Sequence, residues 1–264
     1  MMRLRHIVLA VAIWLTAAPG GAAQSAAEHV ATGAAAYDRV DLAGALEQFD
    51  AALALDSLEY GANWQAARTL IDLGSATPDT ERSPARDSLY RRAEALARRA
   101  VAVNPEGADG HFLLAYSLGR VALTRGKKER IRMASEIRTE VLRAIELNPR
   151  HDGAYHVWGR WHAEIMRLSG VQRFFAKSFL GAGIFNQASW QGAVDNLEKA
   201  VERAPENIYH RLDLAQVYVD RKRYSDARRQ LDTIATLPAV APHDAEHKQA
   251  ADALLQKMAK REDK

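Results

Sequence analysis

Nine histidines are the residues of this chain best suited to bind a metal, and three of them lie close together in the sequence. His151, His156 and His162 are separated by five and six residues. A helical metal site usually uses ligands four residues apart, whereas these spacings turn the side chains toward different faces of a helix. The chain has no cysteine, which excludes thiolate ligands, cysteine nucleophiles and disulfides. We therefore expect no metal site and no cofactor.

No other arrangement of residues predicts catalysis. The sequence has no glycine-rich phosphate loop, nucleophile elbow or dinucleotide fingerprint, and Gly181 and Gly183 form only half of such a motif. Carboxylates at helical spacing, such as Glu198 and Glu202, are typical of a solvated face. Basic residues at 91–92 and 98–99 lack the aromatic ladder that stacks nucleic-acid bases. We expect neither an enzyme nor a nucleic-acid-binding protein.

Two sets of mostly small residues alternate along the chain and predict the elements. The first set is Gly33, Ala67, Ala115, Gly159 and Ala215, and the second set is Ala45, Ala93, Ile137, Ala193 and Ala227. Each member of the second set precedes the next member of the first by 22 residues. The distance from each member of the first set to the following member of the second set varies. It is 12 residues in the first and fifth units, and 26, 22 and 34 residues in the second, third and fourth units. The shortest unit therefore has the 34-residue period of tetratricopeptide helix pairs.

The residues around these positions resemble the tetratricopeptide consensus over nearly all of residues 27–237. Examples are Trp158-Gly159 in a first helix and Ala193, Leu197 and Ala200 in the following second helix. Apolar residues at helical spacing between His243 and Arg261 predict one more helix that shields the last pair. The predicted fold is all-α: a tetratricopeptide-type α-solenoid of about five helix pairs plus a C-terminal capping helix, forming a single domain over residues 24–264.

The second, third and fourth units are longer than the 34-residue period, and all their additional residues lie between the two small positions of the same pair. In the second unit, residues 74–80 predict a loop, and Ser83 predicts a cap on a helix that begins with Pro84. In the third unit, apolar residues continue at helical spacing and predict longer helices. Pro105, Pro149 and Pro205 each close a unit and could open the next helix at its first position.

The fourth unit contains a phenylalanine-rich insert at residues 170–187. One interpretation is a short helix folded back onto the array; the alternative is an exposed lip for a partner, lipid or acyl chain. Two basic residues four positions apart could face anionic head groups. The residues of this possible lip are Arg173, Phe174, Phe175, Lys177, Phe179 and Phe185.

In tetratricopeptide arrays the first helices line a concave groove, and the resemblance implies which residues of this chain do so. They are Trp64, Arg68, Phe112, Tyr116, Arg120, His156, Arg160 and Gln216, with Leu212, Asp72 and Glu164 at related offsets. This mixture of aromatic residues and arginines suits an extended or helical peptide of some acidic character. The Lys/Asn clamp of members that bind chaperone tails is absent. Alternatively, some aromatics only pack between pairs, which we favour for Trp158 and Trp161.

The fourth unit also resembles a specific family, the regulator of microtubule dynamics proteins. The resemblance lies in residues 148–161, 172–177 and 193–212, within a similarity over roughly residues 85–255. It implies a helical-repeat adaptor without known chemistry, some members being anchored in a membrane near the N-terminus.

Residues 1–23 predict a signal peptide, which departs from that family. A positive start is followed by the apolar run Ile7 to Ala18 and by small residues before Gln24. The run is shorter than the roughly 20 residues that span a bilayer, so an uncleaved membrane anchor is the less favoured alternative. We expect an exported protein, periplasmic or secreted, and do not transfer the family's cellular role.

These observations favour a non-catalytic scaffold or adaptor that binds a peptide or protein partner in its concave groove. The alternative is a protein that binds lipid or a membrane surface through the phenylalanine-rich insert.

Overall fold

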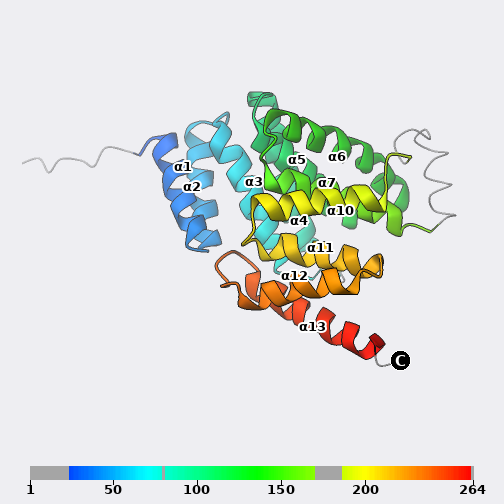
Figure 1. The fold of residues 1–264 in the computed structure, drawn as a ribbon. Coiled ribbons are helices and arrows are strands. Elements are labelled where there is room, and N and C mark those ends of the chain that lie inside the picture. The colour runs from blue at the N-terminus through cyan, green and yellow to red at the C-terminus, as the bar shows by residue number, and fades with distance from the viewer. Residues whose placement is uncertain (1–23, 79–80, 170–185, 263–264) are drawn as a thin grey trace, which may run out of the picture.

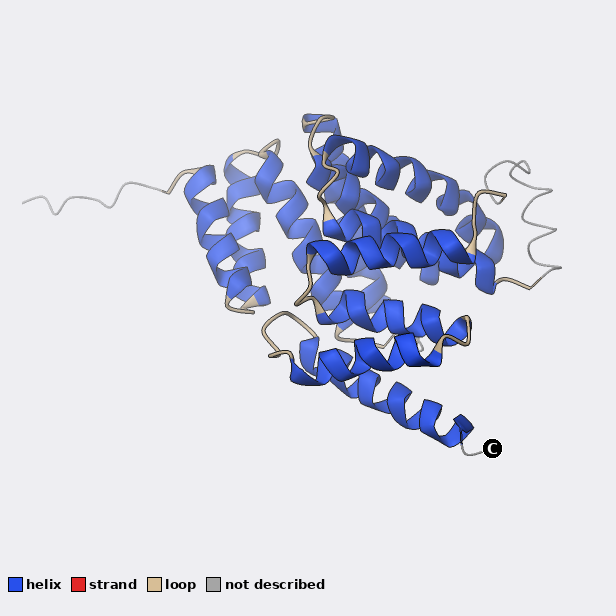
Figure 2. Ribbon diagram, viewed as in Figure 1, coloured by secondary structure: helices blue, strands red, loops and turns tan. Residues whose placement is uncertain are grey.

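The computed structural model describes residues 24–78, 81–169 and 186–262, and in these ranges the elements are helices without strands (Figure 2). The first helices of the pairs are α1 (Ala26–Asp38), α3 (Tyr60–Ser75), α5 (Ala108–Leu123), α7 (Asp152–Arg167) and α11 (Ile208–Asp220). The second helices are α2 (Leu42–Leu55), α4 (Pro84–Val103), α6 (Lys127–Leu147), α10 (Trp190–Arg203) and α12 (Tyr224–Thr236). The helix α13 (Asp244–Glu262) follows the last pair.

The described helices pack in sequence order (Figure 1). The two helices of each pair contact one another, and each pair contacts the next. The first helices also touch directly, since α3 contacts α5, α5 contacts α7 and α7 contacts α11. This arrangement confirms the predicted α-solenoid of five helix pairs with a C-terminal helix.

The small residues lie where the two helices of a pair pack together. A Cβ atom placed on Gly33 would lie 2.6 Å from the Phe49 ring, and one on Gly159 would lie 2.6 Å from Leu197. Carbon atoms ordinarily pack at about 3.5–4.0 Å, so neither site admits a larger residue unless the neighbouring helix moves. The alanines of both sets are fully buried as well: Ala45, Ala67, Ala93, Ala115, Ala193, Ala215 and Ala227.

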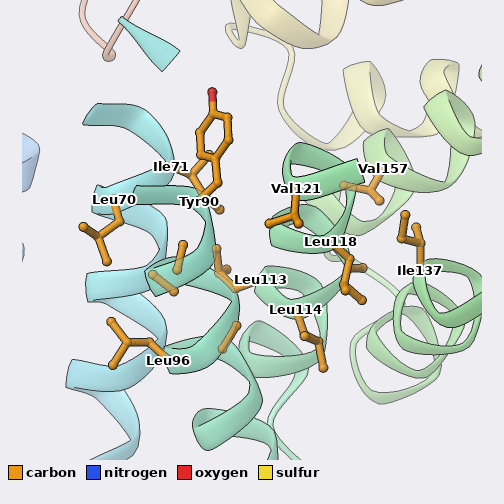
Figure 3. Packing of buried hydrophobic residues seen from close by; sticks show 14 of the residues in the cluster. Leu70, Ile71, Tyr90, Leu96, Leu113, Leu114, Leu118, Val121, Ile137 and Val157 are labelled. Carbon is orange, nitrogen blue, oxygen red and sulfur yellow. The ribbon is translucent and has the colours of Figure 1, made fainter. Parts of the chain in front are cut away.

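Large apolar side chains fill the space around these contacts. Leu70 and Ile71 of α3, Tyr90 of α4, and Leu113 and Leu118 of α5 are at most 1% exposed and form part of one cluster (Figure 3). A second cluster joins Ala163 of α7 to α10, α11, α12 and α13. The buried surface therefore runs along the array, as expected where each repeat is stabilised by its neighbours.

The additional residues of the second and third units lie in different kinds of structure. α3 ends at Ser75 and α4 begins at Pro84, where the Ser83 hydroxyl accepts the Arg86 backbone N–H at 3.2 Å, as predicted. In the third pair the helices themselves are long, and α6 has 21 residues. Three other prolines end a unit as predicted, but the expectation that they also open the next helix was wrong. Pro105, Pro149 and Pro205 each lie two residues after one helix and three residues before the next begins, so they occupy the turn.

Trp158 and Trp161 of α7 pack between helices rather than facing a ligand. Their ring centroids are 4.6 Å apart, and the side chains are 9% and 5% exposed. The indole N–H of Trp161 donates to the Ala134 carbonyl of α6 at 2.8 Å. The packing role favoured for both residues is confirmed.

α13 covers the last pair. Ala251 and Met258 are buried in the cluster formed with α11 and α12. None of the described helices combines the length and apolar character needed to cross a membrane.

Two sequence predictions fall outside the described residues. The signal peptide at 1–23 is one, and the other is the phenylalanine-rich insert, of which only residues 186–187 are described. Its four phenylalanines, Arg173 and Lys177 all fall in the part not described, so the predictions about export and about the lip stay predictions.

We predict that Gly159→Ala lowers the free energy of unfolding by about 1–2 kcal/mol, since the new methyl group meets Leu197. The matched control is Gly119→Ala in α5, where an added Cβ has no atom within 4 Å. That change should be neutral or stabilise by about 0.5–1 kcal/mol through helix propensity. Urea unfolding of both variants tests the packing, and equal effects would contradict it.

We also predict that acid destabilises the protein through His162. Its ring is 5% exposed beside both tryptophans, and its Nδ1 accepts the Ser189 backbone N–H at 3.2 Å. Burial lowers the pKa of His162 to about 4, because the charged ring loses its hydration.

Between pH 6.5 and pH 4, the unfolded chain therefore binds a proton at His162 that the folded chain does not. The free energy of unfolding should fall as the pH falls through this window, by at most about 1.4 kcal/mol per pH unit from this residue. His162→Gln should reduce that slope while its side-chain oxygen can still accept from Ser189. Unfolding curves with unchanged slopes would show that His162 is not the cause.

Candidate functional site

A cavity of about 1060 Å³ lies along the first helices of the array. Its wall is built from α3, α5, α7 and α11, with Tyr37 of α1 and residues near the start of α13. All eight residues predicted from the consensus offsets line this cavity: Trp64, Arg68, Phe112, Tyr116, Arg120, His156, Arg160 and Gln216. The structure thus brings the predicted residues together, and their use in binding stays a prediction.

The offsets from the small residues sort the lining side chains into three layers. The aromatic layer lies three positions before the small residue and contains Trp64, Phe112 and His156, and the aliphatic Leu212 has the same offset in α11. The donor layer lies one position after it and contains Arg68, Tyr116, Arg160 and Gln216. The charged layer lies five positions after it and contains Asp72 and Arg120. Glu164 and Asp220 have the same offset but are exposed and lie outside the lining.

Ring contacts organise the aromatic layer. Phe112 stacks with Tyr116 one turn later, with ring centroids 5.9 Å apart. It also lies 4.5 Å from the ring of His151, the residue that caps α7 through a hydrogen bond from Ala154 N–H. Phe112 and Trp64 are half-buried and line the cavity.

A buried polar network joins α7 to α11. The ring Nε2 of His156 donates to Asp213 Oδ2 at 2.7 Å, and Arg160 Nη1 lies 3.3 Å from the same oxygen. Arg160 also donates to the Tyr209 hydroxyl. The ring of His156 stacks on His210 with centroids 4.5 Å apart. These contacts anchor the Arg160 side chain in the cavity wall.

Burial and charge determine which members of this network are ionised. Burial lowers the pKa of His156 to about 4, so its ring is neutral near pH 7. Burial would raise the pKa of Asp213, but the Arg160 guanidinium and the His156 hydrogen bond hold it well below its usual range. Asp213 is therefore a carboxylate whose charge Arg160 balances.

The other two cavity arginines each contact a tyrosine side chain. The Arg68 guanidinium lies over the Tyr37 ring, 3.7 Å from its centroid. Arg120 donates to the hydroxyls of Ser75 and Tyr90. The Tyr37 hydroxyl in turn donates to the Asp72 carboxyl group.

The segment 237–247, which we call the closing segment, joins the end of the array to α3 across the cavity. His243 Nε2 donates to the backbone carbonyl of Asp72 at 2.8 Å, a contact between residues 171 positions apart. The backbone of His243 is left-handed, with φ of 66°, and the Asp244 carboxylate accepts the N–H groups of Val240 and Ala241. His247 stacks on Tyr209, with centroids 4.7 Å apart.

No residue pattern in the sequence indicates this closure. The apolar residues between His243 and Arg261 predict correctly that the last helix shields its neighbours, but not that the loop before it reaches the second pair. The connection from Thr236 to Asp244 is longer than the turns between α1 and α2 or between α11 and α12, and this length was the available signal. Length alone does not say where a loop lies.

Histidines are concentrated at the cavity. His156 lines it, whereas His162 packs against Trp158 and Trp161 outside the lining, as expected for different faces of α7. Five of the nine line the cavity: His151, His156, His210, His243 and His247. His151 precedes α7 as its cap, so helical spacing does not apply to it. Within the described part of the chain, no group of three histidine or acidic side chains is placed to hold a metal ion.

We predict that His243→Asn opens the closing segment without unfolding the array. Asparagine tolerates the left-handed backbone of His243 but is too short to replace the ring contact with Asp72. The matched control is Lys222→Asn, because Lys222 is exposed and also left-handed, with φ of 60°.

Hydrogen–deuterium exchange should become faster in residues 237–247 of His243→Asn and stay unchanged in α5 and α6. Lys222→Asn should not change exchange in the closing segment. Unchanged exchange in His243→Asn would show that this contact does not hold the closure.

Comparison with known proteins finds a matching family and related sequences. Residues 30–259 match the family described as Regulator of microtubule dynamics protein 1-3. The chain is 26% identical over 195 residues to Regulator of microtubule dynamics protein 3 of Rattus norvegicus, covering 72% of this chain and 40% of that protein. It is 29% identical over 114 residues to Regulator of microtubule dynamics protein 1 of Bos taurus, covering 43% of this chain and 35% of that protein.

A solved structure shows the same fold. A thermophilic TPR protein of Thermus thermophilus, TTC0263, aligns with a TM-score of 0.60 and 20% identity, covering 88% of this chain and all of the other. The chain spans less than half the length of the relatives named above. The family match extends over most of the described array, from α1 into α13, and the chain belongs to the regulator of microtubule dynamics family.

Proposed function

We propose that this protein is a non-catalytic scaffold that holds a segment of a protein partner in the cavity along its first helices. The observation that carries the proposal is the convergence of the first helices of four consecutive pairs on one cavity. Stacked helical repeats present extended concave surfaces of this kind to their partners. At about 1060 Å³ the cavity is at the upper end of the sizes typical of small-molecule pockets, which suits a short peptide segment.

The chemistry of the wall also supports binding rather than catalysis. Half-buried aromatic faces of Trp64 and Phe112 offer contact area for apolar side chains. His156 is 3% exposed and already donates to Asp213, so it is poorly placed to exchange a proton with a substrate. Both His156 and Asp213 thus form hydrogen bonds within the wall itself.

The alternative function, binding to lipid or a membrane surface, depends on residues 170–185, which are outside the described ranges. No described contact favours it over the cavity. It stays a prediction, as does export.

The test is selection of a random peptide library displayed on phage against the full chain. We predict enrichment of peptides whose affinity falls at least about tenfold with Trp64→Ala plus Phe112→Ala, because truncating a central aromatic contact typically costs more than 1 kcal/mol. The matched control is Trp190→Ala, which removes a half-buried aromatic residue that does not line the cavity.

Circular dichroism and thermal unfolding should show that all variants remain folded. If no peptides are enriched, or if the enriched peptides bind the cavity variant as tightly as the wild type, the proposed function is wrong.

A further inference from the structure

His247 lies in the first turn of α13, at the end of the closing segment. Its ring stacks on Tyr209 of α11, with centroids 4.7 Å apart and an interplanar angle of 9°. The ring centroid of His243, which holds the closing segment to the Asp72 carbonyl of α3, lies 6.4 Å from that of His247. Both histidines line the cavity. Two contacts between the closing segment and distant helices are therefore made by neighbouring titratable rings.

The surroundings of His247 suit a neutral ring. Its Nδ1 atom is buried and has no hydrogen-bond partner among the described residues. A protonated imidazole carries a hydrogen on both ring nitrogens, so the Nδ1–H group of a charged ring would be buried here without an acceptor. The positive charge would also lie near the N-terminus of α13, where the helix dipole disfavours cations.

Three carboxylates near His247 oppose this preference. Asp213 of α11 already pairs with Arg160 of α7, which balances its charge. The Asp244 carboxylate accepts two backbone N–H groups of the closing segment. Glu246 is exposed, so water screens its charge. None of the three therefore offers His247 an unengaged and buried negative partner.

Basic and buried groups act in the same direction as the orphaned nitrogen. His243 faces His247 across the start of α13, and Asp72 behind His243 accepts the Tyr37 hydroxyl. Toward α12, Lys248 donates to two backbone carbonyls at the end of that helix. Burial, followed by the charge of His243, lowers the pKa of His247 despite the three carboxylates.

The direction of the coupling between protonation and closure follows from these contacts. Once it leaves Tyr209, the His247 ring returns to water and to its ordinary pKa of about 6.5. The released segment therefore binds a proton more tightly than the closed segment does, so acid favours release. The effect is absent well above about pH 6.5, where the ring is neutral in both arrangements, and it grows as the pH falls below this value.

We propose that the closing segment is an acid-operated latch, in which protonation of His247 releases residues 237–247 from α3 and α11. Six residues of the segment line the cavity, so its release widens access to the cavity wall. The latch can be tested without a partner, and only its use in admitting a partner segment rests on the proposed function.

The test measures the distance between spin labels at Ala76→Cys and Ala241→Cys in the full chain as the pH is changed. We expect a short distance at about pH 7.5 and a second, longer distance that grows between about pH 6.5 and about pH 5. A single proton raises the ratio of released to closed molecules by at most about tenfold per pH unit. Circular dichroism at each pH should show that the helices remain folded.

Two substitutions remove the titrating group. His247→Phe keeps a ring that can stack on Tyr209 but cannot bind a proton, so the short distance should persist to about pH 5. His247→Gln removes the ring as well, so the released fraction should rise at about pH 7.5 but should no longer change with pH. The matched control is His162→Gln, which removes a buried histidine outside the lining and should keep the pH-dependent distance.

A distance distribution that does not change with pH in the parent chain would overturn the inference. Release that stays equally pH-dependent in both His247 variants, or that loses its pH dependence in His162→Gln, would assign the effect to another group and overturn it as well. A longer distance that appears only together with loss of the helical circular-dichroism signal would show that acid unfolds the array instead of releasing the segment.

The outcome for the latch is separable from the outcome for the proposed function. If acid releases the segment but no peptide is selected from the library, the latch stands and the proposed function fails. If peptides are selected but the segment stays closed in acid, the scaffold stands and the latch fails.

Discussion

The structure depends on the close approach of the two helices within each pair. Where Gly159 faces Leu197 and Gly33 faces Phe49, a single added carbon would collide with the opposite side chain. Close packing at these sites holds the hairpins together, and stacked hairpins place α3, α5, α7 and α11 next to one another. The cavity is a consequence of this stacking, because residues at equal offsets on successive first helices face the same side.

Helix stacking alone does not account for the contact between the end of the array and α3. That feature comes from the closing segment, in which a left-handed His243 donates to the Asp72 carbonyl while His247 stacks on Tyr209. One hydrogen bond of this kind contributes about 1 kcal/mol, far less than the buried surface of the helix pairs. The closure should therefore open at a lower free-energy cost than the array, which suits a cavity that a partner segment has to enter.

The sequence was informative wherever structure depends on local periodicity. The alternating small residues predict the five pairs, and offsets from Ala67, Ala115, Gly159 and Ala215 predict eight residues, all of which line the cavity. It was uninformative about contacts that depend on long-range geometry. The bonds from His243 to Asp72 and from His156 to Asp213 join residues 171 and 57 positions apart, and no local pattern specifies them. The expected helix starts at Pro105, Pro149 and Pro205 were wrong for a local reason, because proline is common both in turns and at the first position of a helix.

The most direct measurement of the central claim is the distance between spin labels at positions 76 and 241. Ala76 and Ala241 are both exposed, line the cavity from the α3–α4 loop and the closing segment, and belong to a chain without native cysteine. The contact between the closing segment and α3 predicts a single narrow, short-range distance distribution for Ala76→Cys plus Ala241→Cys, which broadens and lengthens when His243→Asn is added. A broad, long distribution already in the otherwise unchanged chain would show that the array does not close around the site.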